Sequence, residues 1–391
     1  MGWPEYLMAS TLLGVLGRIF ARFPFRARRV VFATARTPVL EGNLAFIHRA
    51  MRERRPDVDC VFLLEPYSYG WMGKLRYLFR LVRGVYYLQT SGLVVVDNAY
   101  FPVHVVSHRP ATTVVQVWHA AGALKRFGLD APVLRRPSER RFLHRNYDYV
   151  VVGGESARGP YASALRTPVP RVLALGSPRT DFFFDHAAMA TARQRIVAAH
   201  PELDGRTVVL YAPTFRGAGE TKRPAPGFDA ERLRAQLPDS HLLVLKTHPN
   251  LDPGATPTAG FDLVIEHTAE INELFTVSDI LVTDYSSSIF EWALLRRPLV
   301  LLVGDLERYE HDPGMYIDYR QGMIGTQVTD MDGVAAAILG GAFDLDAYEG
   351  FVERHLAMSD GHASARFVAR FAPDPVAART RDRLPAHVGH E

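Results

Sequence analysis

Short apolar runs rich in Val, Ile and Leu alternate along the chain with longer stretches of helix-like periodicity. Continuous runs of this kind are typical of strands buried on both faces, and their alternation with helices is typical of parallel α/β sheets. Because the runs are so numerous, the pattern predicts two parallel sheets rather than one. The predicted strands include residues 29–34, 58–64, 92–96, 114–117, 149–152, 172–175, 208–211, 242–246, 263–265, 280–283 and 299–303.

Two segments rich in Pro, Gly and polar residues interrupt this pattern. Residues 167–204 favour a domain boundary, because linkers have this composition. Residues 216–227 predict a mobile loop that follows a strand. We therefore expect an α/β domain over residues 1–190, a second α/β domain over 191–345, a helical segment over 346–371 that packs back, and a frayed tail over 372–391.

The length and composition are those of a globular protein. The 391 residues are 48% hydrophobic and 22% charged, which is too apolar for a disordered chain. At about 100–200 residues per domain, the length also favours two domains. The single cysteine, Cys60, excludes an internal disulfide and a CxxC metal site, and we expect it to be a small core residue in a protein of a reducing compartment.

The overall net charge of +3 hides a strong asymmetry. Residues 1–150 contain 22 Lys and Arg against 10 Asp and Glu, a balance of +12, whereas the remaining residues contain 23 against 32, a balance of −9. A basic half of this kind indicates an anionic partner, such as a lipid surface, a polyphosphate polymer or a nucleic acid. Because no nucleic-acid-binding motif accompanies it, we expect no nucleic acid partner. A solvated basic face is the simpler alternative.

The N-terminal residues 7–25 are apolar but include Arg18 and Arg22. The chain has no run of about 18 apolar residues, so no membrane-spanning helix is predicted. The basic residues lie within and after the apolar stretch, whereas a signal peptide carries them before it. We expect either an amphipathic segment that lies on an anionic bilayer or an N-terminal helix packed on its own domain.

Polar side chains follow several predicted strands, at the sheet edge where α/β proteins bind their ligands. The strand 114–117 leads into Trp118-His119, and a helix is predicted after Gly122. A histidine in this position is suited to proton transfer near neutral pH. Lys125 adds positive charge that suits a phosphate. A purely structural histidine is the alternative for a single motif of this kind.

A second strand, 242–246, ends in Lys246, Thr247 and His248. Pro249 disfavours helical backbone at His248, so we expect the strand to stop there with these side chains facing a cleft. Two strand-end histidines in different halves of one chain are suited to divide the roles of general base and phosphate stabiliser.

The strand 280–283 is followed by Ser286, Ser287 and Ser288, which open a predicted helix. Free backbone N–H groups, the positive end of the helix dipole and the hydroxyl groups together favour an anion. Glu291 lies one helical turn further along and is suited to accept hydrogen bonds from ribose hydroxyls. Simple helix capping is the structural alternative.

Two smaller motifs suggest the same chemistry. The strand 208–211 leads to Thr214 and Arg216, and the strand 172–175 leads to Arg179, whose guanidinium suits bidentate phosphate contact. Plain turns are the alternative for both. No His, Asp or Glu cluster has the spacing of metal ligands, and neither a Walker loop nor a GxGxxG motif occurs. We therefore expect no metal and no cofactor, and neither a kinase nor a dehydrogenase.

Taken in order, these motifs resemble the CDP-glycerol glycerophosphotransferase family, the wall teichoic acid primases and polymerases. The resemblance extends from about Lys74 to Phe371 and depends on the order and spacing of residues 77–98, 118–119, 176–181, 211–214, 248–249, 283–287, 305–309, 314–319 and 360–366. The chain departs from the family after His119, where Ala-Ala-Gly-Ala-Leu-Lys replaces the usual Gly-Thr-Pro-Leu-Lys. Glu291 and Lys246 stand where the family commonly has Asp and Arg.

The resemblance implies two Rossmann-like α/β domains in a glycosyltransferase-B-like fold, with the active site in the interdomain cleft. The N-terminal domain would face the acceptor and an anionic membrane surface, at the cytoplasmic side, and the C-terminal domain would bind the CDP-activated donor. By position, His119 and His248 correspond to the catalytic histidines of the family. The implied donor contacts are Trp118, Ala120, Ala121, Gly122, Arg179, Pro213, Thr214, Lys246, Thr247, Ser286, Ser287 and Glu291.

The reaction that the resemblance implies is metal-independent transfer of glycerol phosphate, or a related polyol phosphate such as ribitol phosphate, from a CDP-alcohol to a hydroxyl of a lipid-linked acceptor. The product would belong to teichoic acid or a related cell-surface polymer, with release of CMP. We hypothesise that His119 is the general base. The groups expected to stabilise phosphate charge are His248, Lys246, Arg179 and the helix end at Ser286 and Ser287. A nucleotide-sugar glycosyltransferase or epimerase with the same fold is one alternative. A non-catalytic protein that binds anionic lipid or polymer is another.

Overall fold

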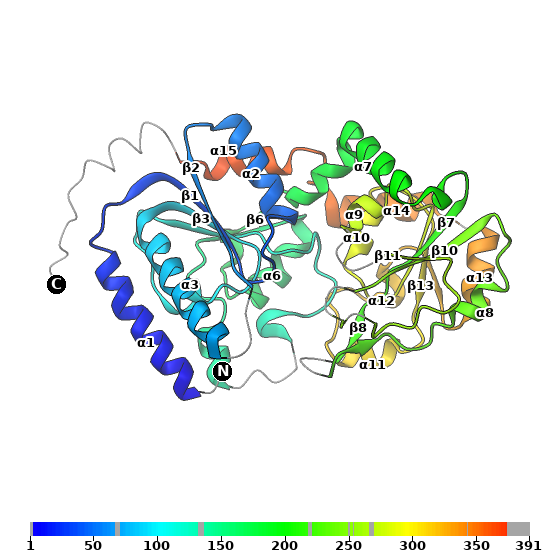
Figure 1. The fold of residues 1–391 in the computed structure, drawn as a ribbon, viewed down its shortest axis with the longest axis horizontal. Helices are drawn as coiled ribbons and strands as arrows, with labels where there is room; N and C mark the ends of the chain where they lie inside the picture. The colour runs from blue at the N-terminus through cyan, green and yellow to red at the C-terminus, as the bar shows by residue number, and fades with distance from the viewer. Residues whose placement is uncertain are drawn as a thin grey trace. The chain divides into compact units, whose positions relative to one another are not determined.

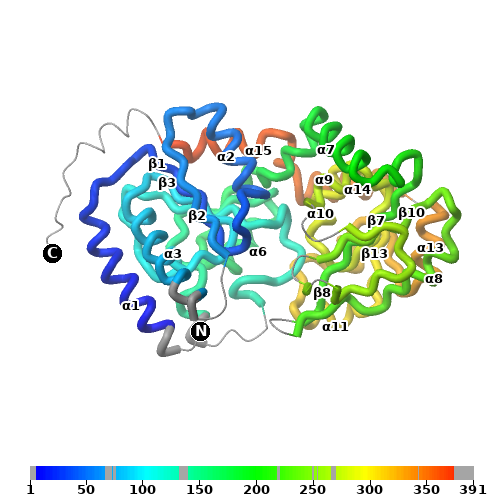
Figure 2. The backbone as a smooth tube through the Cα atoms, viewed as in Figure 1, coloured from blue at the N-terminus to red at the C-terminus, as the bar shows by residue number. Residues whose placement is uncertain are grey.

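The computed structural model describes residues 3–66, 71–131, 137–217, 221–248, 251–252, 254–265, 270–341 and 343–373. They form two compact units, each built on its own sheet (Figures 1 and 2). Unit 1 comprises Met1–Ala121, Arg126–Asp181 and Ala357–Glu391, and unit 2 comprises Gly122–Lys125 and Phe182–Leu356. The chain therefore enters unit 2 directly after Ala121, returns to unit 1, and enters unit 2 again after Asp181.

The last helices divide between the two units. The helix α14 (Leu345–Leu356) belongs to unit 2, whereas α15 (Ala363–Phe371) belongs to unit 1 and packs against α2 (Gly42–Arg54). The division at Asp181 and the return at Ala357 thus differ in detail from the expected boundaries at residues 190 and 346. The expected tail lies outside the described residues beyond Pro373.

Unit 1 contains a parallel six-stranded sheet in the order β2-β1-β3-β4-β5-β6. The helices α2 and α15 cover one face, where Ile47 and Phe367 join the core with Phe32 of β1. The helix α3 contacts β1 and β3 and packs against α1. The strands are Arg26–Thr34 (β1), Asp59–Leu64 (β2), Ser91–Val96 (β3), Thr113–Gln116 (β4), Tyr149–Val152 (β5) and Val172–Ala174 (β6), and the remaining helices are Trp3–Phe20 (α1), Trp71–Thr90 (α3), Phe101–Val105 (α4), Pro137–Phe142 (α5) and Arg158–Ala164 (α6).

Unit 2 contains a second parallel six-stranded sheet in the order β11-β10-β7-β12-β13-β14. The helices α8 and α13 cover one face through Leu233 and Val334, and α10 packs against α14. The strands are Thr207–Tyr211 (β7), His241–Lys246 (β10), Leu263–Ile265 (β11), Ile280–Thr283 (β12), Leu299–Leu302 (β13) and Thr326–Val328 (β14), and the remaining helices are His186–Ala199 (α7), Ala230–Arg234 (α8), Ile271–Leu274 (α9), Ser288–Ala293 (α10), Leu306–His311 (α11), Tyr319–Gly322 (α12) and Met331–Gly340 (α13).

All strands predicted from the apolar runs are present, with small differences at their ends. The pattern missed β14, because this short strand is half-buried and has no continuous apolar run. The loop predicted over residues 216–227 follows β7 and includes parts of a short hairpin that the sequence did not predict. Phe215–Arg216 (β8) pairs antiparallel with Arg223–Pro224 (β9), and residues 218–220 lie outside the described part of the chain.

The helix α1 has two different faces. Leu13 is fully buried, and a Cβ on Gly17 would come within 2.6 Å of Val106, so one face packs tightly on unit 1. Leu12 and Ile19 on another face are exposed. Among the described residues, no helix is long and apolar enough to cross a membrane.

Candidate active site

The first candidate histidine, His119, lies in a tight turn after β4, at the carboxyl edge of the unit 1 sheet. The preceding Trp118 has a φ of 48°, and a bulky residue in this region costs about 1–3 kcal/mol. The side chain of Gln116 supports the turn, because its Oε1 accepts a hydrogen bond from the Trp118 N–H at 2.8 Å. The indole and imidazole rings stack with their centroids 4.7 Å apart.

The imidazole of His119 is oriented by a backbone carbonyl. Its Nδ1 lies 3.4 Å from the carbonyl oxygen of Asp97. Because a carbonyl only accepts hydrogen bonds, this contact favours a proton on Nδ1, and the neutral ring then carries its lone pair on Nε2. The Asp97 carboxyl is itself buried, and this burial raises its pKa. The contact with the Asp97 carbonyl therefore favours the tautomer that a general base requires.

Arg179 comes from the turn after β6 and meets the same segment. Its guanidinium donates a hydrogen bond to the carbonyl of His119 at 3.1 Å. The turn depends on Gly176, which has a φ of 90° and whose Cβ, if present, would come within 2.3 Å of the Met358 carbonyl. The structure thus brings together His119 and Arg179, which lie 60 residues apart in the sequence.

The neighbouring alanines have packing contacts in unit 1. The carbonyl of Ala120 accepts a hydrogen bond from the Tyr161 hydroxyl at 3.1 Å, and Ala121 is buried. Gly122 belongs to unit 2, where a Cβ would come within 2.4 Å of the Phe290 ring of α10. This close approach explains why glycine stands at position 122.

In unit 2, three neighbouring strands end close together in the sheet: β10, β7 and β12. Their carboxyl ends carry His248, Thr214 and Ser286, respectively. The ring of Phe215, next to Thr214, lies 4.8 Å from the His248 ring between centroids. The parallel topology therefore gathers most of the predicted donor-binding residues of unit 2 at one edge of the sheet.

Lys246, the last residue of β10, is almost completely buried. Burial lowers the pKa of its ammonium to about 8, and the carboxylate of Glu270 partly opposes that shift. The Nζ donates a hydrogen bond to the carbonyl of Thr247 at 3.3 Å. Lys246 is thus cationic at neutral pH but titrates much closer to it than an ordinary lysine.

His248 has a different electrostatic environment. Burial, and next the positive charge of Lys125, lower the pKa of His248 to about 4. The imidazole is therefore neutral near pH 7. A neutral His248 can stabilise a phosphate oxygen through an N–H group, but not as a cation. Pro249, which was expected to end the strand, lies outside the described residues.

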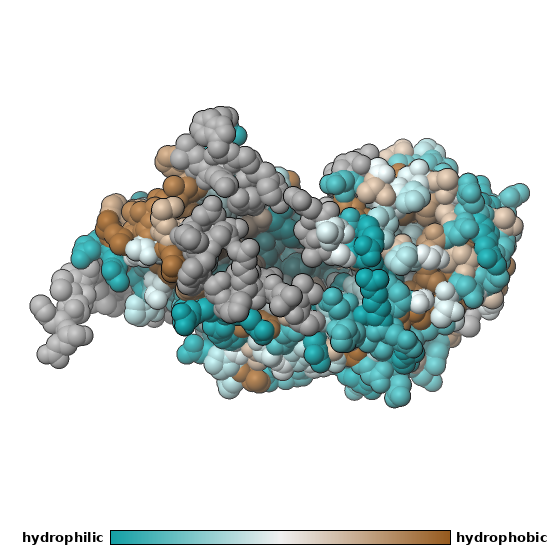
Figure 3. Space-filling model, turned by 90° about the horizontal axis from the view of Figure 1, so that it is seen from below, coloured by the Kyte–Doolittle hydropathy of each residue, from teal (hydrophilic) through white to brown (hydrophobic). Residues whose placement is uncertain are grey.

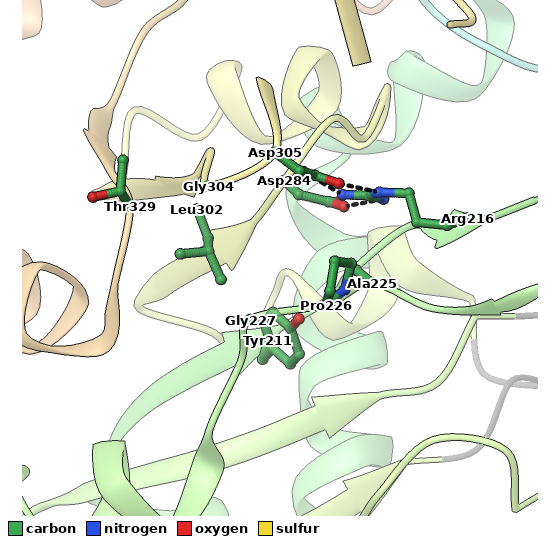
Figure 4. A pocket seen from close by; sticks show the side chains of 10 residues that line it. All are labelled: Tyr211, Arg216, Ala225, Pro226, Gly227, Asp284, Leu302, Gly304, Asp305 and Thr329. Carbon is green, nitrogen blue, oxygen red and sulfur yellow. Dashed lines mark hydrogen bonds and ion pairs between the residues drawn. The ribbon is translucent and has the colours of Figure 1, made fainter. Parts of the chain in front are cut away.

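A network of charged groups holds the β7 end in place (Figure 4). Arg216 forms ion pairs with Asp284 at 2.8 Å and with Asp305 at 2.7 Å. Asp284 also accepts hydrogen bonds from the N–H of Thr214 at 2.8 Å and from its hydroxyl at 2.6 Å. The charge of Arg216 is therefore balanced by two carboxylates, and its role in the structure is to fix the Thr214 turn. Pro213 within this turn is buried.

A pocket of about 250 Å³ opens beside this network. Its walls include Tyr211 at the end of β7, Leu302 at the end of β13, and Thr329. Tyr211 is stacked on Phe228, with ring centroids 3.5 Å apart. The pocket lies within unit 2 at the same sheet edge as Asp284.

The serine-rich turn after β12 leads into a short helix. α10 begins at Ser288, and the hydroxyls of Ser286 and Ser288 lie 2.7 Å apart. Ser287 is the N-cap residue but forms no side-chain capping bond. Glu291, on the same helix, is only 2% exposed. Among the described residues, no group of three His, Cys, Asp or Glu side chains is placed to hold a metal ion.

Sequence analysis missed two residues that shape the His119 turn. Gln116 lies within an apolar run, and Asn43 lies in the first turn of α2, far away in the sequence. The side-chain amide of Asn43 donates to the carbonyls of Val117 and Trp118, at 3.1 and 2.9 Å. A polar residue inside an otherwise buried run was the available signal for Gln116, whereas no local pattern relates Asn43 to His119.

A family model and individual sequence relatives of this chain agree with each other. The family model described as CDP-Glycerol:Poly(glycerophosphate) glycerophosphotransferase matches residues 15–372. The chain is 32% identical to a teichoic acid poly(ribitol-phosphate) polymerase of Bacillus spizizenii, over 90% of this chain and 57% of that protein. It is 31% identical to a teichoic acid ribitol-phosphate primase of the same species, over 92% of this chain and 96% of that protein.

Solved structures with the same fold include the wall teichoic acid polymerase TagF. Two TagF structures, one of them soaked with CDPG, superpose with TM-scores of 0.75 and 0.73 at 19% identity, over 97% of each chain. This likeness confirms the predicted glycosyltransferase-B-like α/β fold with two parallel sheets. The chain spans little more than half of the polymerase relative from Bacillus spizizenii but nearly all of the primase. The family match and the identity to these relatives show that the chain is a transferase that belongs to the CDP-glycerol:poly(glycerophosphate) glycerophosphotransferase family.

Proposed function

We propose that this protein transfers a polyol phosphate from a CDP-activated polyol to a hydroxyl group of a lipid-linked acceptor and releases CMP, in the synthesis of teichoic acid or a related cell-surface polymer. The observation that carries the proposal is the pair of strand-end histidines, His119 and His248, in a member of this transferase family. Because the two Bacillus spizizenii relatives are named for ribitol phosphate, CDP-ribitol is the first donor to test, and CDP-glycerol the second.

In the proposed reaction, the acceptor oxygen attacks the β-phosphorus of the donor as its proton passes to Nε2 of His119. A new P–O bond forms, and the bond between this phosphorus and the oxygen of CMP breaks. The hydrogen bond from His119 Nδ1 to the Asp97 carbonyl supports this role, because it leaves Nε2 as the basic nitrogen. Arg179, held at the same turn, would neutralise charge on a phosphate.

Unit 2 would supply the donor site in this proposal. Lys246 provides a positive charge at neutral pH, and His248 provides a neutral N–H group for a phosphate oxygen. The Ser286 and Ser287 hydroxyls are further hydrogen-bond donors, and Glu291 would accept from the ribose. Such preorganised donors stabilise the charge that develops during phosphoryl transfer.

We further propose that the exposed face of α1 rests on an anionic lipid surface. Leu7, Met8, Leu12, Val15 and Ile19 are each more than two-fifths exposed on this helix, and Figure 3 shows hydrophobic side chains gathered on one face of unit 1. Arg18 and Arg22, which are exposed along the same stretch, suit negatively charged headgroups. The basic balance of residues 1–150 supports the same partner.

The test of the transfer proposal is the release of CMP or UDP from CDP-ribitol, CDP-glycerol and a UDP-sugar, each with a lipid-linked acceptor primed with glycerol phosphate. CMP release from one of the CDP-polyols, dependent on acceptor, is the expected result and identifies the donor. Release of UDP from the nucleotide sugar, with no CMP from either CDP-polyol, would contradict the proposal and favour a glycosyltransferase or epimerase.

The membrane proposal is tested by flotation with vesicles. We expect binding to vesicles that contain phosphatidylglycerol and weak binding to pure phosphatidylcholine, and we expect Leu12→Glu with Ile19→Glu to abolish it. Leu339→Glu, at an exposed leucine of unit 2, is the matched control and should bind like the wild type. Equal binding by the α1 double variant would overturn the assignment of this face.

A further inference from the structure

We infer that Asn43 is a positioning residue that fixes the candidate base His119 and the phosphate-binding Arg179 relative to each other. The inference rests on the proposed function, since it assigns a role in that reaction. Asn43 is the second residue of α2 and is only 2% exposed. Nothing in its own segment requires a buried amide, so its contacts explain its presence.

The side chain of Asn43 makes every hydrogen bond of which an amide is capable. Its Nδ2 donates to the carbonyl oxygens of Val117 and Trp118, at 3.1 and 2.9 Å. Its Oδ1 accepts from the Ser177 hydroxyl at 3.1 Å and from the Arg179 N–H at 2.9 Å. An amide has two donors and two acceptor lone pairs, so this environment satisfies Asn43 completely and also defines the orientation of the amide.

These bonds join two turns that are distant in sequence. The donor half of Asn43 holds the turn between β4 and His119, and the acceptor half holds the turn after β6 that carries Arg179. The guanidinium of Arg179 then donates to the His119 carbonyl at 3.1 Å, which closes a ring of hydrogen bonds. The left-handed backbone at Trp118 lies inside this ring.

Substitutions can separate the role of the amide NH2 group of Asn43 from that of its amide oxygen. Asn43→Asp keeps the acceptor oxygen toward Ser177 and Arg179 but places a carboxylate oxygen opposite the two carbonyls, so the His119 turn loses its donors and is repelled. Asn43→Ala removes both halves. We therefore expect Asn43→Asp to affect mainly the position of the base, and Asn43→Ala to affect the base and the phosphate-binding arginine together.

The experiment measures CMP release for the wild type, Asn43→Asp and Asn43→Ala, each also in a His119→Ala background. Because a displacement of about 1 Å can cost about 10²-fold in rate, we expect Asn43→Asp to lower kcat by about 10- to 100-fold with little change in the donor KM. Asn43→Ala should lower kcat and also raise KM. In the His119→Ala background, Asn43→Asp should cost no further activity, because it acts through His119.

A matched control is Asn146→Asp, elsewhere in unit 1. The Asn146 amide also donates to two backbone carbonyls, those of Val103 and Val106, at 2.8 and 3.2 Å. Thermal unfolding of both Asp variants compares their effects on stability, and only Asn43→Asp should lower kcat. The inference is overturned if Asn146→Asp lowers kcat equally, or if Asn43→Asp loses the same factor with and without His119.

A second readout does not depend on turnover. With histidine rings labelled with ¹³C and the His119 signal assigned by its loss in His119→Ala, we expect Asn43→Asp to shift or broaden this signal and to leave that of His241 unchanged. An unchanged His119 signal in Asn43→Asp would overturn the inference even in an active enzyme. If no CDP-polyol is consumed by the wild type, the proposed function fails, and the ring signal alone decides whether Asn43 positions His119.

Discussion

The two candidate histidines occupy equivalent places at the ends of parallel strands, but their surroundings differ in chemistry. The His119 turn in unit 1 is held by neutral amides, those of Asn43 and Gln116, and by the Asp97 carbonyl. His248 in unit 2 lies among ionised groups, with Lys246 and Lys125 among the charges that act on its pKa. Hydrogen bonds to uncharged groups orient an imidazole ring and select its tautomer, whereas nearby charges set its protonation state.

In the proposed reaction, this difference suits the two residues to different roles. A general base needs one nitrogen with a defined lone pair, which the bond from Nδ1 of His119 provides. A group that stabilises a polyphosphate needs positive potential, which Lys246 supplies beside a neutral His248. The same contrast appears in the supporting turns, since the Thr214 turn of unit 2 is held by the Arg216 ion pairs rather than by an amide.

The largest effect is expected for the base. His119→Ala should lower kcat by about 10²–10⁴-fold, the usual contribution of general-base catalysis, with little change in the affinity for CDP measured by calorimetry. His108→Ala is the control, because His108 precedes the same strand at its opposite end. If His119→Ala kept a kcat near that of the wild type, His119 would not be the general base, and the distinction drawn between the two histidines would fail.

A slightly smaller loss is expected for the second histidine. His248→Ala should lower kcat by about 10²–10³-fold, as the loss of one preorganised hydrogen-bond donor does. Because its pKa is about 4, the loss should be nearly constant from about pH 6 to about pH 8. His241→Ala, at the first residue of the same strand, should be active. A loss that grew steadily as pH fell through this range would show that His248 acts as a cation.

The ion-pair support of unit 2 is expected to affect stability. Asp284→Asn removes a charge that is buried against Arg216, and the broken pair should lower the free energy of unfolding by about 3 kcal/mol. Asp332→Asn breaks the exposed pair with Arg232 and should cost less than about 1 kcal/mol. Urea unfolding followed by circular dichroism measures both. If both variants lowered the free energy of unfolding by the same small amount, the Arg216 network would not hold the Thr214 turn.

The smallest effect is expected on the affinity for CDP, through the positive charge of Lys246 beside His248. Donor phosphates favour protonated Lys246, so the affinity for CDP should be full below pH 8 and fall as pH rises above the lysine pKa of about 8. One unit above this pKa the affinity should be weaker by about tenfold at most. Lys246→Arg, whose charge persists, should lose this pH dependence. A pH dependence that survived in Lys246→Arg would have to come from another group.

The fold was predictable because the runs of apolar residues that identify its strands are a local feature of the sequence. Strands buried on both faces need continuous apolar residues, so runs such as 280–283 identify β12 directly. The hairpin strands β8 and β9 were not predictable in this way, because two-residue strands carry no periodicity. The site was predictable in part for the same reason, since Lys246 and His248 simply follow a recognisable strand.

What the order of residues specifies is therefore the set of strands, the polar groups that follow them, and the family to which those motifs belong. The folded chain decides which of these groups meet and in what state: Asn43 reaches the His119 turn across 75 residues, and the charge of Arg216 is balanced by Asp284 and Asp305. Burial decides that His248 is neutral and that Lys246 titrates near pH 8. Periodicity is a property of neighbouring residues, whereas hydrogen-bond partners and desolvation depend on distances that exist only after folding.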